Sequence, residues 1–436
     1  MKNSLLIIGL TMCTYLGFGQ NYYMPTPEGY GESTTGGGSG TPVTVSSYAD
    51  FKANIKLSIP KVILVSGTIT IPAGQNISEV VTNKTIIGLP NARLVNNTQT
   101  QSGSGILNLK NGSNNVIIRN LIFEGPGAYD VDGRDNLTAD GCINLWVDHC
   151  EFQDGVDGNF DIKGNSDNVT VSWCKFTYLK PAVPGGPGGS NDHRFSNLIG
   201  SSDSQAPADG HYSVTFQNCY WAQGCKERMP RGRNGQLHIL NCYYNTDVSS
   251  SRALGFSGGV NTLSCYVENS DFANVGTVYQ SYGGTVSLEF DNCLNAVSNI
   301  GTVPQPTYSY SVTPVEDVAT YVSDVNCGAG ATLDVTSSGE ISSSCETLRV
   351  EDNTFTQIKY YPTLVEDILT LEFPNTDDVN YEFSLYSMNG QKLATEDLVI
   401  NSDRKVELDL RQYTKGLYFA KVRSHKGNKT FRLFKK

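Results

Sequence analysis

The sequence of 436 residues contains little charge and no hydrophobic run long enough to cross a membrane. Charged residues make up 17% of the chain, and 43 acidic residues outnumber 32 Lys and Arg residues, which gives a net charge of −11. This acidity disfavours nucleic acid and anionic membranes as partners. No segment reaches the ~18 uninterrupted apolar residues of a transmembrane helix. The abundance of glycine (44 residues) and of aromatic residues is typical of a β-rich extracellular protein.

The N-terminus has the features of a cleavable export signal. A single positive charge precedes an apolar run over residues 5–16, and small residues follow at the positions that a signal peptidase reads. We therefore expect residues 1–19 to be a signal peptide and the mature chain to begin at Gln20. A lipoprotein signal at Cys13 is the alternative, although Met12 fits poorly before a lipidated cysteine.

The cysteines lack the paired C-x-x-C spacing of a zinc site. Ten remain after removal of the signal, and an even number in an exported protein permits disulfides. We expect these cysteines to be structural, and the sequence leaves their pairing open. They are Cys142, Cys150, Cys174, Cys219, Cys225, Cys242, Cys265, Cys293, Cys327 and Cys345.

The middle of the chain repeats a short apolar segment. Aligned copies give two adjacent columns, and successive copies are 29, 24, 45, 23, 28 and 23 residues apart. The basic period is therefore about 23 residues, and the step of 45 contains one large insertion. The first column holds Asn120, His149, Trp173, Asn218, Asn241, Asn269 and Asn292, and the second holds Leu121, Cys150, Cys174, Cys219, Cys242, Ser270 and Cys293.

This spacing predicts an all-β fold, a right-handed parallel β-helix over residues 20–335 in which each repeat is one turn. Such turns stack at about 4.8 Å, and equivalent side chains form ladders. Asn at a tight bend can bond its own backbone and the amide of its ladder neighbour. The cysteine column then packs in the core rather than binding metal. An ordinary β-sandwich, the alternative, does not explain two adjacent columns.

The ends of the solenoid differ from its middle. Residues 48–55 look helical and could cap the open end of the coil. A Ser-rich stretch predicts a linker over residues 336–350. Residues 351–436 show alternating strand patterns separated by Gly and Asn turns, which predicts a small β-sandwich as the C-terminal domain.

Three aspartates have the spacing of a metal site. Asp157 and Asp161 lie four residues apart, and Asp135 comes from the preceding turn. In an extended coil these carboxylates can converge on one hard cation, and ligands made only of oxygen favour calcium. Solvated loop carboxylates are the simpler explanation of this pattern when it is taken alone.

A cluster of cations occupies residues 226–233 of this otherwise acidic chain. Four of these eight residues are Lys or Arg. Because alternate residues of an extended segment face the same way, Arg231 and Arg233 should share one side, with Arg228 nearby. The contrast with the acidic remainder makes an anion-binding cleft a serious alternative to a solvated surface.

Taken together with the solenoid, these motifs resemble polysaccharide lyase family 1, the extracellular pectate lyases. The resemblance covers roughly residues 25–335, and its motifs follow one another in the right order and spacing. They are N-V-I-I-R-N-L (115–121), D-N-L-T-A-D-G-C-I-N-L-W-V-D-H-C-E-F (135–152), D-G-N-F-D-I-K (157–163), V-T-V-S-W-C-K-F (169–176), L-I-G-S-S-D (198–203) and R-M-P-R-G-R-N-G-Q-L-H (228–238).

The resemblance implies a parallel β-helix enzyme that cleaves polygalacturonate by calcium-assisted β-elimination, giving 4,5-unsaturated oligogalacturonates. Calcium would neutralise the uronate carboxylate, and an arginine would remove the proton on carbon five. Because an unperturbed guanidinium keeps its proton beyond about pH 12, we expect an alkaline rate optimum. Carried over residue by residue, the resemblance assigns Ca²⁺ to Asp135, Asp157 and Asp161, the base to Arg228, and a substrate carboxylate to Arg233.

One further substrate-binding cation is ambiguous. The family has a lysine shortly after the V-T-V-S-W strand, and Lys180 is the nearest equivalent. An insertion follows that strand, however, which makes Arg194 a rival. From the cationic cluster we also expect Arg231 to bind substrate.

The sequence leaves other functions open. A non-catalytic β-helix adhesin could bind pectin, but it would need no arginine base. A pectin lyase acting on methyl-esterified chains would dispense with the calcium aspartates. A glycoside hydrolase on the same kind of coil would use carboxylates as acid and base.

The C-terminal region resembles the sorting domain of the Bacteroidetes type IX secretion system. This implies the secretion machinery as a partner and a secreted or cell-surface location, and we expect a monomer. A carbohydrate-binding sandwich is the alternative. The resemblance rests on Y-Y-P-T-L-V-E-D-I-L-T-L (360–371), S-M-N-G-Q-K-L (387–393) and K-G-L-Y-F-A-K-V (415–422).

Overall fold

The computed structural model describes residues 22–343, 345, 358–373, 380–387, 391–400, 403–424 and 427–436. These residues form two compact units, one ending at Cys345 and the other made of the C-terminal strands. The expected signal peptide, residues 1–19, lies outside the described residues. No helix in the described ranges is long and apolar enough to span a bilayer.

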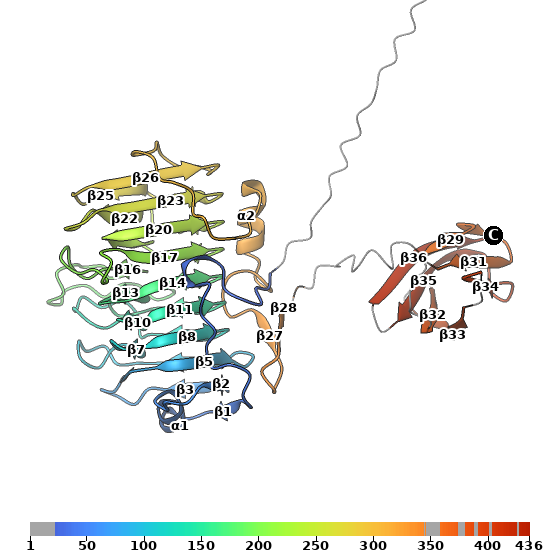
Figure 1. Cartoon of the computed structure of the whole chain (residues 1–436), viewed down its shortest axis with the longest axis horizontal. Helices are drawn as coiled ribbons and strands as arrows, with labels where there is room; N and C mark the ends of the chain where they lie inside the picture. Colours follow the sequence, from blue (N-terminus) through green and yellow to red (C-terminus); the bar gives the residue numbers. More distant parts are fainter. Residues whose placement is uncertain are drawn as a thin grey trace, which may run out of the picture. The chain divides into compact units, whose positions relative to one another are not determined.

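The larger unit is a solenoid of three parallel sheets (Figure 1), which confirms the predicted parallel β-helix. Consecutive strands pass to different sheets, and each strand pairs with its equivalent in the next turn. Val116, Leu145, Val169 and Val214, for example, occupy the same register position on four successive turns. We call the ten-stranded sheet A and the two eight-stranded sheets B and C.

Within each of these sheets, neighbouring strands follow one another in chain order. Sheet A contains β1 (Val43–Val45), β2 (Lys61–Val65), β5 (Thr82–Gly88), β8 (Asn114–Arg119), β11 (Ile143–Asp148), β14 (Asp167–Ser172), β17 (Tyr212–Gln217), β20 (Gly235–Leu240), β23 (Leu263–Glu268) and β26 (Val286–Asp291). Sheet B contains β3 (Thr68–Thr70), β6 (Arg93–Val95), β9 (Ile122–Glu124), β12 (Glu151–Gln153), β15 (Lys175–Thr177), β18 (Tyr220–Trp221), β21 (Tyr243–Asn245) and β24 (Asp271–Asn274). Sheet C contains β4 (Ile77–Glu79), β7 (Leu107–Leu109), β10 (Leu137–Asp140), β13 (Phe160–Lys163), β16 (Leu198–Ile199), β19 (Arg231–Arg233), β22 (Arg252–Ser257) and β25 (Thr277–Ser281).

The corner between sheets A and B is built on residues in the left-handed conformation. All seven members of the first predicted column have positive φ, between 43° and 54°. Asn adopts the left-handed conformation more readily than most residues, which explains why five of the seven column residues are Asn. His149 and Trp173 fill the other two, and their rings stack with centroids 5.5 Å apart. The predicted tight bend is therefore present in every copy of the repeat.

Aromatic rings just past this corner form a stack in the core. Neighbouring rings have centroids 4.4 to 5.5 Å apart, and each ring is at most 2% exposed. Such pairs add about 0.5–1.5 kcal/mol each beyond the burial of their area. The stack consists of Phe123, Phe152, Phe176, Trp221, Tyr244 and Phe272.

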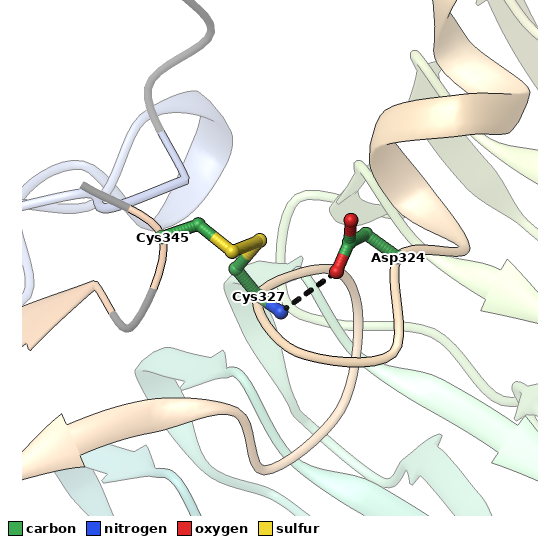
Figure 2. A group of neighbouring side chains, drawn as sticks. All are labelled: Asp324, Cys327 and Cys345. Carbon is green, nitrogen blue, oxygen red and sulfur yellow. Dashed lines mark hydrogen bonds between the residues drawn. A yellow bond between two sulfur atoms is a disulfide. The ribbon is translucent and has the colours of Figure 1, made fainter. Parts of the chain in front are cut away.

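The thiols of the second column are unpaired and face the core, as the repeat predicts. They are buried except for Cys293 at the last turn, which is partly exposed. One disulfide is present among the described residues, between Cys327 and Cys345 (Figure 2), and it lies outside the column.

A short helix closes the N-terminal end of the solenoid. Helix α1 (Tyr48–Ile55) is capped by Ser47, whose side chain accepts the amide of Asp50 at 3.1 Å. Phe51 and Ile55 are fully buried in the solenoid core. The predicted helix is thus confirmed with the same limits.

A long segment after the last turn, residues 303–343, returns along the corner, and we call it the strap. It contains α2 (Val315–Val322), β27 (Leu333–Val335) and β28 (Ile341–Ser343). The amide of Thr313 donates to Asn241 Oδ1 at 3.0 Å, and the amide of Leu333 donates to Asn120 Oδ1 at 2.9 Å. The column asparagines therefore bond mainly to the strap. A bond between ladder neighbours, as the sequence suggested, joins Asn292 Nδ2 to Asn269 Oδ1 at 3.1 Å.

Part of the expected linker, residues 336–350, belongs to the solenoid unit. Strand β28 lies within this range and pairs antiparallel with β27. Cys345 is tied by its disulfide to the loop after α2. Of the rest, residues 344 and 346–350 lie outside the described residues.

The described residues of the C-terminal unit form two sheets. Buried apolar side chains from both sheets form one cluster, with Leu369, Leu385, Val422 and Leu433 at most 1% exposed. One sheet contains β29 (Lys359–Tyr361), β31 (Ile368–Glu372) and β34 (Lys405–Asp409). The other contains β30 (Leu364–Val365), β36 (Gly427–Lys435), β35 (Gly416–Ser424), β32 (Asn380–Ser387) and β33 (Lys392–Val399).

Asn241 tests the energetic role of the corner. Its side chain is 1% exposed and bonds the strap backbone at Ser311 and Thr313. We expect Asn241→Ala to lower the free energy of unfolding by about 2–4 kcal/mol, because it loses two buried hydrogen bonds and strains a left-handed residue. Asn241→Gly, which keeps the backbone conformation, should cost only about 1–2 kcal/mol. Urea unfolding followed by tryptophan fluorescence measures both, and equal losses would contradict a role for the backbone conformation.

Candidate functional site

The candidate residues project from the outer face of sheet C. Ile162 pairs with Ile199, and both are fully buried, so the residues beside them point outward. Leu198 pairs with Arg231 on the next turn. Asp161 thus lies two turns from Arg231, which at about 4.8 Å per turn places their backbones roughly 10 Å apart. One outward face carries acidic residues on earlier turns and basic residues on later ones.

The acidic part contains all three predicted metal ligands. Asp135, in the loop before β10, is 4% exposed, and its Oδ2 accepts the Thr138 hydroxyl at 2.9 Å. Asp161 is 3% exposed, and its Oδ1 accepts the amide of Leu198 at 3.0 Å. Asp157 is more accessible and is held by a histidine, described below. The loop and strand geometry thus fixes two of the carboxylates almost completely away from solvent.

Gly158 leaves a space between two of these carboxylates. A Cβ atom at this residue would lie 2.6 Å from Asp135 Oδ1 and 3.2 Å from Asp161 Oδ1. Both oxygens therefore face one small region that no side chain fills. Burial, together with the negative charge of Asp135, holds the pKa of Asp161 well above its ordinary value. Such mutual repulsion is what a bound cation relieves.

Lys163 partly balances this charge. Its ammonium lies 3.5 Å from Asp135 Oδ2, and this carboxylate raises the pKa of Lys163. A hollow of about 160 Å³ beside the pair is lined by Asn108, Arg134 and Thr138 among others. One lysine against three carboxylates leaves the cluster negative, so it can hold a hard cation.

His193 joins Asp157 to a fourth carboxylate. Its Nδ1 donates to Asp157 Oδ1 at 2.6 Å, and its Nε2 lies 3.5 Å from Asp130 Oδ1. The ring is 3% exposed and belongs to the insertion between β15 and β17. The insertion therefore packs against the acidic cluster, although its sequence has no periodicity that would have indicated this.

Arg228 lies at the boundary between the acidic and basic parts. Its carbonyl accepts the amide of Asn197 at 2.6 Å, and the next amide, that of Leu198, donates to Asp161 Oδ1 at 3.0 Å, so Arg228 lies one turn beyond the residues that contact Asp161. The residue has φ of 61°, a left-handed conformation that is uncommon outside Gly and Asn. Within the described residues its guanidinium has no hydrogen-bond or ion-pair partner, and it lies 3.9 Å from the ring centroid of Phe195.

Arg231 and Arg233 share the outward side of β19, as alternation in a strand requires. The guanidinium of Arg231 lies 3.7 Å from the ring centroid of Tyr282, and burial followed by the charge of Arg233 lowers the pKa of Arg231. Arg233 donates from Nε to Asp203 at 3.1 Å and from Nη1 to the Gly200 carbonyl at 2.7 Å. Three arginines thus gather on one face.

Lys180 and Arg194 are placed differently. The ammonium of Lys180 donates to the carbonyl of Gly125 at 2.9 Å and lies 3.8 Å from a carboxylate oxygen of Asp154. Arg194 makes a two-pronged pair with Asp192, at 2.9 and 2.8 Å. Neither cation is within ion-pair distance of the three predicted metal ligands.

A second group of potential metal ligands is a structural feature. Among the described residues, Asp324, Cys327 and Cys345 are the group whose ligand atoms all lie within 4.8 Å of one another. Figure 2 shows that the two sulfurs are bonded to each other, so neither is a thiolate that could bind metal. Asp324 accepts the amides of Asn326 and Cys327, at 2.8 and 3.2 Å, and so caps a turn.

Sequence reasoning missed His193, Phe195 and Lys163. Lys163 stands inside the D-G-N-F-D-I-K motif, two residues after Asp161, so strand alternation could have placed it beside the cluster. His193 and Phe195 lie in the 45-residue step, where only an unusual D-H-R-F string offered a signal.

Comparisons with known proteins agree with this fold. The family described as pectate lyase matches residues 24–354, and the family described as secretion system C-terminal sorting domain matches residues 359–436. A pectate trisaccharide-lyase of Thermotoga sp. (strain RQ2) is 36% identical over 215 residues, 48% of this chain and 52% of the relative. A probable pectate lyase B of Aspergillus terreus (strain NIH 2624 / FGSC A1156) is 33% identical over 218 residues, 48% and 57% of the two chains. The chain thus spans about half the length of the curated relatives that it matches.

Solved structures share the solenoid. A pectate lyase bound to a hexasaccharide has a TM-score of 0.52 and 20% identity, covering 70% of this chain and 97% of its own. The major allergen of cedar pollen has a TM-score of 0.51 and 19% identity, covering 67% and 90%. These structures show the same fold. Since the family match extends over most of the sequence, the chain belongs to the pectate lyase family and carries a secretion-system sorting domain at its C-terminus.

Proposed function

We propose that the protein is a calcium-dependent pectate lyase that cleaves polygalacturonate by β-elimination, with Arg228 as the base. The observation that carries this proposal is an arginine that has no carboxylate partner among the described residues and lies near the buried Asp135 and Asp161 on one outward face. The family match supports the reaction class. A relative named for a pectate trisaccharide and a similar structure described with a hexasaccharide support the substrate class.

Calcium suits the acidic cluster. Asp135, Asp157 and Asp161 offer only oxygen ligands, which this cation prefers. The space at Gly158, which a Cβ atom would fill, separates the inner oxygens of Asp135 and Asp161. Calcium held by these residues would supply positive charge to the carboxylate of the bound uronate, which makes the proton on carbon five easier to remove.

The chain's own residues would then carry out the elimination. Arg228, in the neutral form that alkaline pH favours, takes the proton from carbon five, and the electron pair left behind forms the double bond between carbons four and five. The glycosidic oxygen on carbon four leaves with its bonding electrons and takes a proton from water. Among the described residues no carboxylate pairs with Arg228, so its N–H donors are available to the sugar.

Arg231 and Arg233 would bind substrate carboxylates by charge-assisted hydrogen bonds. The present partner of Arg233, Asp203, has a side chain that is 68% exposed, and such exposed pairs are weak enough to exchange. Lys180 and Arg194 remain candidates for a further contact. Lys180 is the better of the two, because its side chain is 42% exposed against 21% for Arg194.

Segments at the two ends of the chain would direct its export. We propose that residues 1–19 direct the first step and that the C-terminal sorting domain engages the secretion machinery. The enzyme would then act outside the cell, as a monomer, on de-esterified pectin. A non-catalytic pectin-binding protein would not need Arg228. The tests below therefore distinguish an enzyme from a binding protein.

Calcium should be required for turnover. Chelation should abolish the rise in ultraviolet absorbance of unsaturated uronate, and added calcium should restore it. Asp161→Asn should weaken calcium binding, measured by titration calorimetry, by more than about tenfold. Asp140→Asn, a charge-matched change on the neighbouring strand β10, is the control and should bind calcium almost normally. Full activity in excess chelator would refute the calcium mechanism.

Arg228 and Arg233 should differ in the kinetic parameter that they control. Arg228→Lys should lower kcat by about 10²- to 10⁴-fold, the usual contribution of a general base. Arg233→Lys should raise KM more than it lowers kcat, because it removes a contact made in ground and transition states alike. Both are measured at saturating calcium. Near-normal kcat in Arg228→Lys would mean that another residue is the base.

The C-terminal unit should not contribute to catalysis. Deleting residues 351–436 should leave kcat and KM on soluble polygalacturonate unchanged and should stop export in the native host. Activity assays of the purified protein and fractionation of cells measure the two effects. A large loss of kcat would show that this unit is part of the enzyme.

A further inference from the structure

The structure assigns to Phe195 a role as the positioning residue for Arg228. The inference rests on the proposed function, because it concerns the residue that we propose as the base. The phenyl ring lies under the guanidinium, with 3.9 Å between Cζ and the ring centroid. This is a short cation–π contact.

Phe195 does not serve the solenoid core. It is buried, at 6% exposed, yet it is absent from the hydrophobic cluster that fills the coil. Its ring meets the guanidinium of Arg228 and the ring of His193, whose centroid is 5.0 Å away. A buried phenylalanine that lies outside the core cluster and whose ring contacts a guanidinium and an imidazole is more consistent with positioning than with packing.

The backbone around this contact is held from both sides. Phe195 forms a bridge with Glu227, and its carbonyl accepts the hydroxyl of Tyr178 at 2.6 Å. The carbonyl of Arg228 accepts the amide of Asn197 at 2.6 Å. The next residue after Arg228 is a fully buried methionine in the core. The ring and the guanidinium therefore meet because their backbones are fixed beside each other.

A ring suits this task better than a carboxylate. An aspartate or glutamate at this place would also hold the arginine, but it would occupy the donors and strongly favour the protonated form. An aromatic face holds the cation by only about 0.5–2 kcal/mol. It also leaves the nitrogen edges of the guanidinium unbonded. Phe195 thus orients Arg228 without competing for the proton or for the sugar.

The test compares Phe195→Leu with Phe195→Tyr at saturating calcium. Leu keeps an apolar side chain but has no aromatic face, so kcat should fall about tenfold while KM stays close to that of the parent. Tyr keeps the face and should restore most of kcat. Phe123→Leu, a matched change in the core stack, should lower thermal stability but not kcat. If Phe195→Leu keeps full kcat, or Phe123→Leu loses as much, the inference is wrong.

Two further measurements distinguish an effect of the Phe195 ring on Arg228 from an effect on the calcium site. Calcium affinity of Phe195→Leu should equal that of the parent, whereas a marked loss would mean that the ring acts through His193 and Asp157, which overturns the inference. Phe195→Leu should add nothing to the loss in Arg228→Lys, since the ring acts through the guanidinium. If the loss of kcat in the double variant equals the product of the losses in the two single variants, the inference is refuted.

Crystal structures distinguish failure of this inference from failure of the proposed function. In Phe195→Leu the Arg228 guanidinium should move or lose defined density, and an unchanged position would overturn the positioning role. If Arg228→Lys keeps the kcat of the parent, Arg228 is not the base. The proposed function then fails at this residue, and positioning of Arg228 by Phe195 has no catalytic role. The position of the guanidinium is then still reported by the Phe195→Leu structure.

Discussion

The left-handed corner is the constraint on which the rest of the solenoid depends. In each of the seven copies of the repeat the chain bends from sheet A into sheet B at one residue, and these seven residues all have φ between 43° and 54°. Because every turn bends at the same point, equivalent positions stack from turn to turn without drift. The aromatic stack, the buried thiols and the outward residues of sheet C are all consequences of that fixed register.

Register also explains how the candidate site on sheet C arises from distant parts of the sequence. Asp161, Leu198 and Arg231 come from three turns of different length, yet they occupy neighbouring places on sheet C. The three aspartates and the three arginines are thereby separated along the solenoid axis, and among the described residues no ion pair joins the two sets. The long insertion adds what the regular turns lack, a histidine beside Asp157 and an aromatic ring beneath Arg228. A repetitive scaffold and one irregular segment together make the site.

The sequence predicted the features that follow a period. The corner column, the buried thiols and the helix at residues 48–55 were all predicted correctly, because each depends on local conformation or on alternation. The partners of Asn120 and Asn241 could not be predicted, since a side chain at a corner can bond to its neighbours or to a segment 72 to 213 residues away. The role of Phe195 could not be predicted for a similar reason. The sequence of an aperiodic insertion does not indicate which charged group a single aromatic residue will contact.

The strap limits how this solenoid can evolve. Solenoids commonly gain or lose whole repeats, because each turn contacts only its neighbours. In this chain Thr313 and Leu333 bond asparagines on particular turns, and Ser311 bonds Glu28 near the start of the described chain. If Thr313 kept its bond to Asn241, a coil inserted or deleted between the turns of Asn120 and Asn241 would displace Leu333 from Asn120 by about 4.8 Å. Duplication of a turn would therefore require a matching change in the length of the strap. This requirement restricts changes in the number of coils during evolution.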